Sequence, residues 1–110
     1  MIEIEVLNHL KEYIEKPVYM GYAEEKTGQY ITVEKTNSGI EDRIDYARFA
    51  IQSYADSLFD AAKLNNDVKI VMNMMPAVAN VGKVKCNTDY NFTDNTTKKY
   101  RYQAVYDIWY

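Results

Sequence analysis

Apolar residues recur along this chain at two different periods, and each period predicts a different kind of element. Near the start, Val6, Leu10 and Ile14 follow the three- and four-residue spacing of an amphipathic helix. This spacing predicts a helix over residues 2–15. Pro17 ends it, because the residue before a proline avoids the helical region.

The next third of the chain has the alternation of strands. Residues 18–20 are long enough for a short edge strand, and residues 29–35 are rich in strand-forming side chains. Residues 36–39 are a cluster of turn-forming residues, and a third strand is predicted over residues 43–54. Its two faces are Ala47, Phe49, Ile51 and Ser53 on one side and Tyr46, Arg48, Ala50 and Gln52 on the other.

A second helical period follows. Asp56 or Ser57 can cap this helix, which is predicted to run to about Met74 and to stop at Pro76. Its apolar stripe consists of Leu58, Ala61, Ala62, Leu64, Val68, Val71, Met72 and Met75.

The last part of the chain is predicted to be a hairpin. Residues 84–92 and 100–110 both alternate with period two, and the polar residues 93–99 between them have turn chemistry. The predicted order is therefore αβββαββ. It implies an α+β fold with an antiparallel-rich sheet of four to five strands and two helices packed on one face. A length of 110 residues predicts one domain over 1–110.

Composition and charge narrow the possible functions. The chain has eleven tyrosines but one histidine and one cysteine, and no apolar run approaches the ~20 residues of a membrane helix. Residues 1–45 hold ten acids and five bases, whereas residues 46–110 hold six acids and eight bases. This charge distribution is not that of a typical nucleic-acid-binding protein, in which one face is strongly basic.

The residues that carry chemistry are sparse. His9 has no partner at metal-ligand spacing, and Cys86 has no nearby base, so a buried inert thiol is expected there. The carboxylate pairs, Glu24 with Glu25 and Asp42 with Asp45, are expected to be solvated. Glycine-rich phosphate loops are missing from the sequence. We therefore expect no enzyme activity, no metal and no cofactor.

One basic concentration lies in the predicted hairpin, where cations interleave with aromatic residues. A hairpin with one core face and one solvated face explains it, and a protein contact or a single-stranded nucleic-acid platform are the alternatives. The acidic isoelectric point of about 5.1 argues against nucleic acid. The residues concerned are Lys83, Lys85, Lys98, Lys99 and Arg101 with Tyr90, Phe92, Tyr100 and Tyr102.

Three stretches resemble a known family. Phe49–Leu58, Asn87–Asp94 and Lys99–Ile108, with the Pro-Val-Tyr start at Pro17 and Ile-Thr-Val-Glu-Lys from Ile31, resemble tail terminator proteins. These tail completion, or tail-to-head joining, proteins belong to long-tailed bacteriophages and prophages of the type that infects Gram-positive bacteria. The resemblance covers nearly the whole chain.

The resemblance implies a structural role in the virion. Such a protein is made in the host cytoplasm and forms a homo-hexameric ring on the finished tail tube, at the tail–neck junction. The ring ends polymerisation of the tail tube protein and offers a docking surface to the head connector. DNA passes through the ring without specific binding, and no membrane, cofactor or turnover is involved. A head completion or stopper protein of the same neck remains an alternative.

Candidate site residues follow from this expectation. Polar loops are natural docking elements, and a channel for DNA should not grip phosphate, so acidic side chains suit its wall. The docking candidates are Thr93, Asp94, Asn95, Thr96, Thr97, Lys98 and Lys99 in one loop and Tyr22, Glu24 and Glu25 in the other. The lumen-lining candidates are Glu24, Glu25, Glu41, Asp42 and Asp45.

Overall fold

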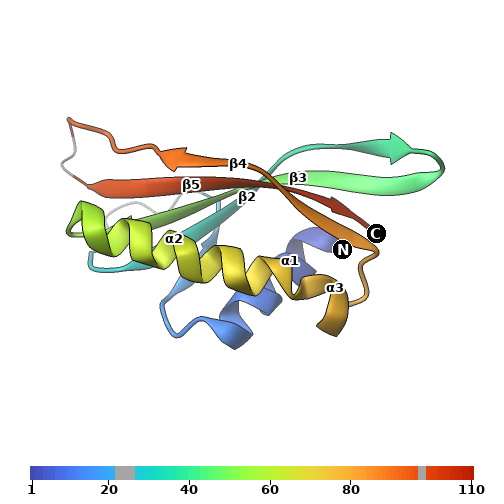
Figure 1. Ribbon diagram of the computed structural model, residues 1–110, viewed down its shortest axis with the longest axis horizontal. Coiled ribbons are helices and arrows are strands. Elements are labelled where there is room, and N and C mark those ends of the chain that lie inside the picture. The colour runs from blue at the N-terminus through green and yellow to red at the C-terminus, as the bar shows by residue number, and fades with distance from the viewer. Residues whose placement is uncertain (22–26, 97–98) are drawn as a thin grey trace.

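One five-stranded sheet with helices on a single face makes up the fold (Figure 1). The computed structural model describes residues 1–21, 27–96 and 99–110. The elements are α1 (Ile2–Tyr13), β1 (Val18–Met20), β2 (Tyr30–Glu41), β3 (Ile44–Ala55), α2 (Leu58–Asn73), α3 (Met75–Val78), β4 (Lys83–Asn91) and β5 (Tyr100–Trp109).

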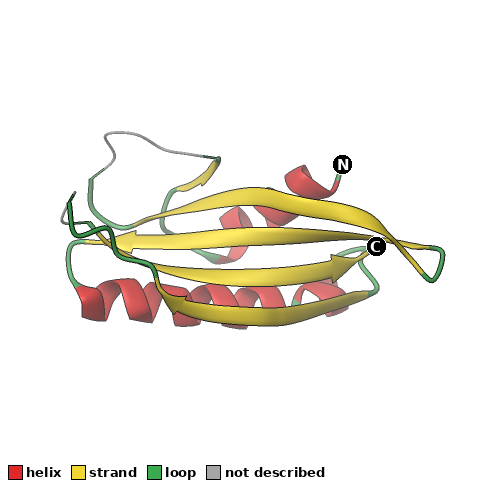
Figure 2. Cartoon of the chain, turned by 90° about the horizontal axis from the view of Figure 1, so that it is seen from above, coloured by secondary structure: helices red, strands yellow, loops and turns green. Residues whose placement is uncertain are grey.

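The strands lie in the order β1-β2-β3-β5-β4. β1 runs parallel to β2, and every other neighbouring pair is antiparallel. Figure 2 shows the four long strands side by side with the helices behind them. The α+β class, the antiparallel-rich sheet and the element order predicted from the sequence are confirmed, with the short α3 as an addition.

The core lies between the sheet and the two long helices. Phe49 and Ile51 of β3 are fully buried, as are Val68 of α2 and Leu10 of α1. Burial of such side chains contributes roughly 1.5–3 kcal/mol each. The predicted division of the β3 faces is confirmed on this side, where Ala47, Phe49, Ile51 and Ser53 are all buried.

The predicted turn at residues 36–39 is wrong. Those residues belong to β2, which bulges at Thr36 and then pairs with β3 as far as Glu41. The turn is formed instead by Asp42 and Arg43, with φ values of 50° and 65°. Two consecutive positive φ values match the primed two-residue turns that suit the twist of a hairpin.

The helix ends agree with the predictions in part, since the predicted cap of the second helix at Ser57 is confirmed and the other ends differ. α1 ends at Tyr13 because Ile14 is already extended, with φ of −119° and ψ of 127°. α2 begins after Ser57, whose hydroxyl accepts a hydrogen bond from the Asp60 amide at 3.1 Å. Pro76 does not stop the chain from being helical, since it lies in the first turn of α3, where its missing N–H costs nothing.

His9 joins the two long helices. Its ring is buried in α1, and Nε2 lies 2.6 Å from the carbonyl oxygen of Val71 in α2, to which it donates. Within the described part of the chain, no helix combines the length and the apolar character needed to cross a membrane.

Candidate interaction surfaces

The sheet face opposite the helices, here called the open face, carries an aromatic cluster near the start of β2. Tyr30 and Tyr54 stack with ring centroids 4.5 Å apart and planes at 9°, and Tyr19 meets Tyr30 edge-on at 6.1 Å. Both stacked rings are buried, although all the helices in the described part of the chain lie on the other face of the sheet. The cluster therefore behaves as a second, small core.

Two basic side chains cover this cluster. Lys99 Nζ lies 5.4 Å from the Tyr30 ring centroid and 3.3 Å from its hydroxyl. The Arg101 guanidinium lies 4.4 Å from the Phe92 ring and donates to the Tyr54 hydroxyl at 3.0 Å. Cation–π contacts of this kind tie both cations to their own chain. Lys99 and Arg101 are therefore less available to bind the phosphates of a nucleic-acid strand.

A ladder of polar side chains crosses the open face from strand to strand. Thr32 donates to Gln52 at 2.7 Å, and Gln52 donates to Gln103 at 2.7 Å. Gln103 in turn donates to the Tyr90 hydroxyl at 2.5 Å. The ladder links β2, β3, β5 and β4 in that order. Because each side chain in this row bonds to the next, each of these polar groups has a hydrogen-bond partner within the chain.

A charged pair lies further along the same face. Arg48 contacts Asp107 through two hydrogen bonds, Nε to Oδ1 at 2.7 Å and a terminal nitrogen to Oδ2 at 3.2 Å. Asn87 adds a bond to Oδ2 at 3.2 Å. The Arg48 hydrogen bonds hold the pKa of the Asp107 carboxyl below its usual range, and Asp107 raises the pKa of Arg48.

The hairpin formed by residues 36–45, here called the arm, projects beyond the rest of the sheet (Figures 1 and 2). Every residue of the arm is exposed, including Ile40 at 73% and Ile44 at 48%. The Tyr46 ring lies over Gly39, with its nearest carbon 3.0 Å from where a Cβ would sit. A side chain at position 39 would therefore displace this ring.

A hollow of about 350 Å³ lies at the base of the arm. The Tyr110 amide closes one side by donating to the Asp45 carbonyl at 2.9 Å. Lys83 lies 4.9 Å from the centroid of the Trp109 ring on another side. The lining residues are Glu41, Asp42, Ile44, Gly82, Lys83, Trp109 and Tyr110.

The β4–β5 loop lies at the opposite end of the strands from the arm (Figure 1). Asp94 Oδ1 accepts from the Thr96 amide at 2.9 Å and from its hydroxyl at 2.7 Å. These bonds lower the pKa of Asp94. Asn91 accepts from the Thr93 amide at 3.0 Å in the same way. The described part of the loop thus has two side-chain-stabilised turns.

The two sets of predicted site residues are not brought together. Glu41, Asp42 and Asp45 gather on the arm, whereas Thr93–Thr96 and Lys99 lie at the other end of the sheet. Five further candidates lie outside the described residues, namely Tyr22, Glu24, Glu25, Thr97 and Lys98. Asp42 and Asp45 are exposed, which agrees with their interpretation as solvated carboxylates.

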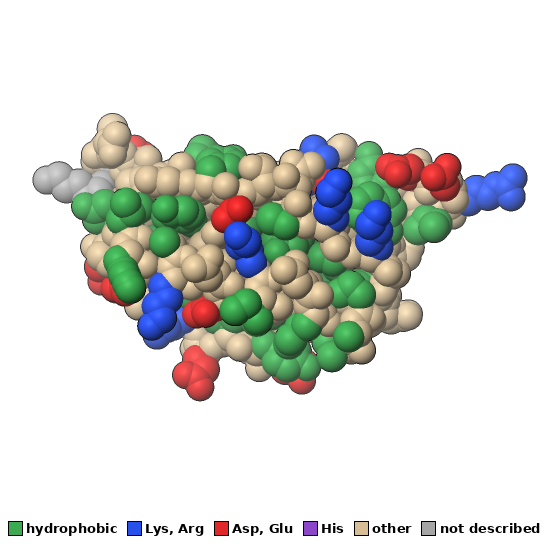
Figure 3. Space-filling view, in the orientation of Figure 1, with side chains coloured by type: hydrophobic (Ala, Val, Ile, Leu, Met, Phe, Trp, Pro, Cys, Tyr) green, Lys and Arg blue, Asp and Glu red, His purple; other side chains and the backbone are tan. Residues whose placement is uncertain are grey.

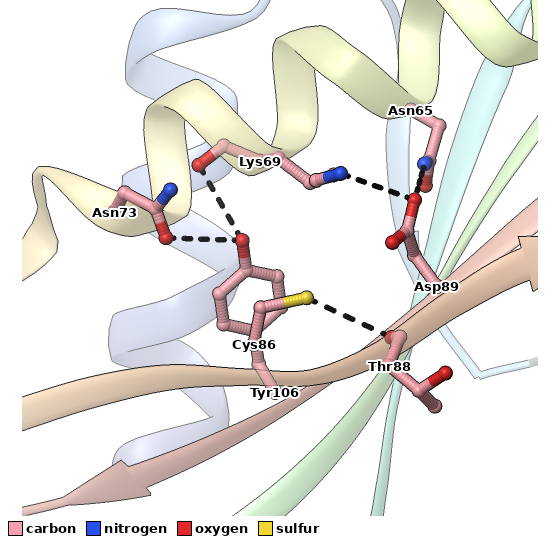
Figure 4. A network of polar contacts seen from close by, with 7 residues as sticks. All are labelled: Asn65, Lys69, Asn73, Cys86, Thr88, Asp89 and Tyr106. Carbon is pink, nitrogen blue, oxygen red and sulfur yellow. Dashed lines mark hydrogen bonds and ion pairs between the residues drawn. The ribbon is translucent and has the colours of Figure 1, made fainter.

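A polar cluster lies between α2 and the helix-facing side of β4 (Figure 4). Asp89 binds Asn65 at 3.0 Å and Lys69 at 3.2 Å. The Tyr106 hydroxyl donates to Asn73 at 3.1 Å, and burial raises its pKa. This cluster fastens α2 to the sheet rather than opening a site.

Cys86 corrects the expectation of a buried thiol. Its exposure is intermediate because it lies near the edge of the sheet, and its Sγ donates weakly to the Thr88 carbonyl at 3.7 Å. The only histidine uses its Nε2 in the contact between α1 and α2. Across residues 1–21, 27–96 and 99–110, no three His, Cys, Asp or Glu side chains gather as a metal site needs.

The fold has a counterpart among solved structures. It is similar to a chain of the "Virion of native gene transfer agent (GTA) particle", with a TM-score of 0.66 and 12% sequence identity. The match covers 94% of this chain and 90% of that chain. At such an identity the likeness establishes a shared fold. No protein-family model and no curated protein matches the sequence.

Two features of these surfaces were not predicted from the sequence. The arm was missed because the predicted turn at residues 36–39 interrupted its first strand. The apolar residues Ile40 and Ile44, which the structure shows to be exposed near the tip, were a usable signal for strand there. The polar ladder was hidden because Thr32, Gln52 and Gln103 come from distant parts of the chain. In the sequence, the ladder was indicated only by polar residues at the positions of three strands that face away from the core.

Proposed function

We propose that this chain is a structural protein of a phage-like virion, and that within the virion it serves as the tail terminator. In this role it caps the tail tube as a homo-hexameric ring at the tail–neck junction, ends tube polymerisation and provides the docking surface for the head connector. DNA passes through the ring without specific binding. The role requires no turnover and no cofactor.

The observation that carries the proposal is the fold likeness to a virion chain over almost the full length of both chains. The likeness to tail terminators in Phe49–Leu58, Asn87–Asp94 and Lys99–Ile108 supports it independently, since it rests on sequence. Because these stretches span β3, β4 and β5, the resemblance includes the centre of the sheet.

The shape of the subunit suits a ring. A ring contact is head-to-tail, so each subunit must carry two different and complementary patches. The two edges of this sheet differ, since one is formed by β1 and β2 and the other by β4. The subunit is also elongated, with principal extents of 43 × 24 × 20 Å. Its two ends can therefore meet two different neighbours along the tail.

The polar loops are the proposed contacts with those neighbours. We assign Thr93–Lys99 and Gly21–Gly28 to docking with the tube or the connector. The acidic residues at Glu24, Glu25, Glu41, Asp42 and Asp45 are the proposed lumen-facing set. Their charge would repel the phosphate backbone and allow DNA to slide.

Electron microscopy of a phage lysate in which this gene is disrupted tests the proposal. We expect full heads beside separate tails of abnormal, overgrown length, because uncapped tubes continue to polymerise. Complementation with the intact gene should restore joined virions of normal tail length.

Two results would overturn the terminator role. Separate tails of correct length would move the protein to another neck position, such as a head completion or stopper protein. Ordinary joined virions would remove the chain from the head–tail junction altogether.

A further inference from the structure

The arm has an unpaired strand edge. β1 covers the outer side of β2 only from Ile31 to Val33. Beyond this point, no strand in the described parts of the chain pairs with that side, as far as Glu41. An exposed strand edge presents unsatisfied N–H and C=O groups and is a template for another strand. This edge is not a frayed end, because β2 stays paired with β3 as far as Glu41.

The opposite edge of the sheet is also open. β4 is the outermost strand on that side, and among the described residues only β5 pairs with it. Its first half carries Lys83 and Lys85, whereas the β2 edge of the arm ends at Glu41, with Asp42 in the adjoining turn and Asp45 on β3. The two free edges therefore carry opposite charges, lysines on β4 and Glu41 at the end of β2. On the face drawn in Figure 3, basic side chains gather near the base of the arm and acidic side chains on the arm.

Lys83 lies level with Gly39 of the arm, because Lys83 pairs with Trp109, Trp109 with Tyr46 and Tyr46 with Gly39. Glu41 therefore lies two residues further along the arm than Lys83. β2 and β4 run in opposite directions, because three antiparallel pairings separate them. Rotation about an axis along the strands preserves strand direction. The β2 edge of one copy therefore meets the β4 edge of the next antiparallel, with the arm beside Lys83–Cys86.

We infer that the arm of one copy adds to β4 of the next copy, so that the sheet continues from subunit to subunit around a ring. This inference rests on the proposed function and names the interface that closes the ring. Strand addition of this kind takes its affinity from backbone hydrogen bonds and its specificity from alternate side chains.

The side chains fit this pairing on both faces. Glu41 is on the open face, as are Lys83 and Lys85, by the register of the pairs Glu41 with Ile44, Lys83 with Trp109 and Lys85 with Asp107. Ile40 and Ser38 are on the helix-facing side, as is Cys86. The exposed Ile40 would gain cover from Val84 and Cys86, which pack partly against the core.

The native cysteine provides the test. Strands tilted against the ring axis are offset between neighbouring copies, and the charge pairing fixes this offset. An offset of two residues puts Glu41 beside Lys83 and Ser38 opposite Cys86, whereas an offset of four puts Glu41 beside Lys85 and Ile40 opposite Cys86. The variants Ser38→Cys and Ile40→Cys, each with native Cys86, are purified and oxidised over a range of protein concentrations. Glu41→Cys is the matched control, because it has the same strand and a neighbouring position but faces the other way. Cys86→Ser in each background removes the acceptor thiol.

We expect one of the two variants to give a ladder of covalent multimers that ends at a closed number of subunits. Glu41→Cys and the Cys86→Ser backgrounds should give none. As a second measurement, Glu41→Lys should weaken self-association roughly fivefold in low salt, and adding Lys83→Glu should restore it. Matching thermal midpoints show that each variant is folded.

Rings visible by electron microscopy without a cross-link from either variant would overturn the inference, as would a failure to form multimers at any concentration. Neither result bears on overgrown tails in the disrupted lysate, so the role at the tail is judged separately. Cross-linked rings together with normal tails in that lysate would keep this interface and reject the terminator role.

Discussion

At the scale of single residues, the open face is held together by side chains that recognise one another. The Arg48–Asp107 pair is the strongest example, since two hydrogen bonds join the groups and the Asp107 side chain is only 10% exposed. A carboxylate bound in this way stabilises the fold while it is ionised. The consequence is a pH dependence that can be attributed to one contact.

We predict that Arg48→Met raises the pKa of Asp107 and flattens the acid limb of the stability profile. The depressed pKa of Asp107 means that its stabilisation is present above the unfolded carboxyl pKa of about 4 and is lost as the pH falls through the lower folded value. The variant should be less stable at neutral pH and approach the wild type in acid. Denaturant midpoints between acidic and neutral pH measure this.

Lys85→Met is the matched control, because Lys85 acts on Asp107 only through space and more weakly than Arg48. It should leave most of the acid limb in place. An Arg48→Met profile parallel to that of the wild type would show that the pair does not control acid stability.

The faces of single residues were predictable, whereas their partners were not. Alternation along residues 43–54 placed Phe49 and Ile51 in the core, because a strand with one buried face has period two. Nothing local could pair Arg48 with Asp107, which lies 59 positions away. Nor could composition show that Tyr30 and Tyr54 would stack on each other on the face opposite the described helices.

At the scale of elements, α2 depends on its first turn. Ser57 has extended backbone angles and accepts from the Asp60 amide, as an N-cap should. We predict that Ser57→Ala lowers the free energy of unfolding by about 1 kcal/mol, and that Ser57→Asp, which keeps an acceptor, has little effect. Urea denaturation measures both. Equal loss in the two variants would mean that the cap contributes nothing.

The arm shows why element boundaries were less predictable than element types. Thr36–Gly39 consists of turn-forming residues, yet pairing with β3 and the Tyr46 ring over Gly39 keep this stretch in a strand. Tertiary pairing overrides local preference when a partner strand is in place. The true turn at Asp42 and Arg43 lacks the glycine that usually marks it.

The β4–β5 loop carries the next prediction. Deletion of Thr93–Lys98 should leave the sheet folded, because the two described turns of this loop are made by side-chain bonds between residues two positions apart. The same deletion should abolish head–tail joining, because the proposed docking contact is removed. Circular dichroism measures folding, and complementation of the disrupted phage measures joining. Normal joining would exclude this loop from docking.

At the scale of the whole molecule, the fold was largely predictable and the surfaces were not. The two hydrophobic periods, together with turn, cap and proline signals, sufficed for the αβββαββ order, because each element buries one face. A surface that binds partners during assembly produces no regular hydrophobic period in the sequence. The sequence therefore did not show that the acidic candidates on the arm and those in the polar loop lie at opposite ends of the sheet.

The proposed channel gives the last prediction. Replacing both Glu24 and Glu25 by Lys should leave ring assembly intact and slow DNA ejection, because cations in the lumen would grip the phosphate backbone. Salt should relieve the delay by screening these charges. Ejection in vitro, triggered and followed by dye uptake, measures the rate. Glu24→Gln with Glu25→Gln is the control for loss of charge without reversal.

The interior position of β5 has a consequence for how the protein is made. β5 lies between β3 and β4, although it is translated after both. During translation, β4 therefore leaves the ribosome before its partner β5 is made. One edge of β3 also stays unpaired until then. Sheet completion becomes a late event dominated by contacts distant in sequence, which fold slowly and leave strand edges open in the meantime. Nascent chains stalled before residue 100 should accordingly depend on chaperones.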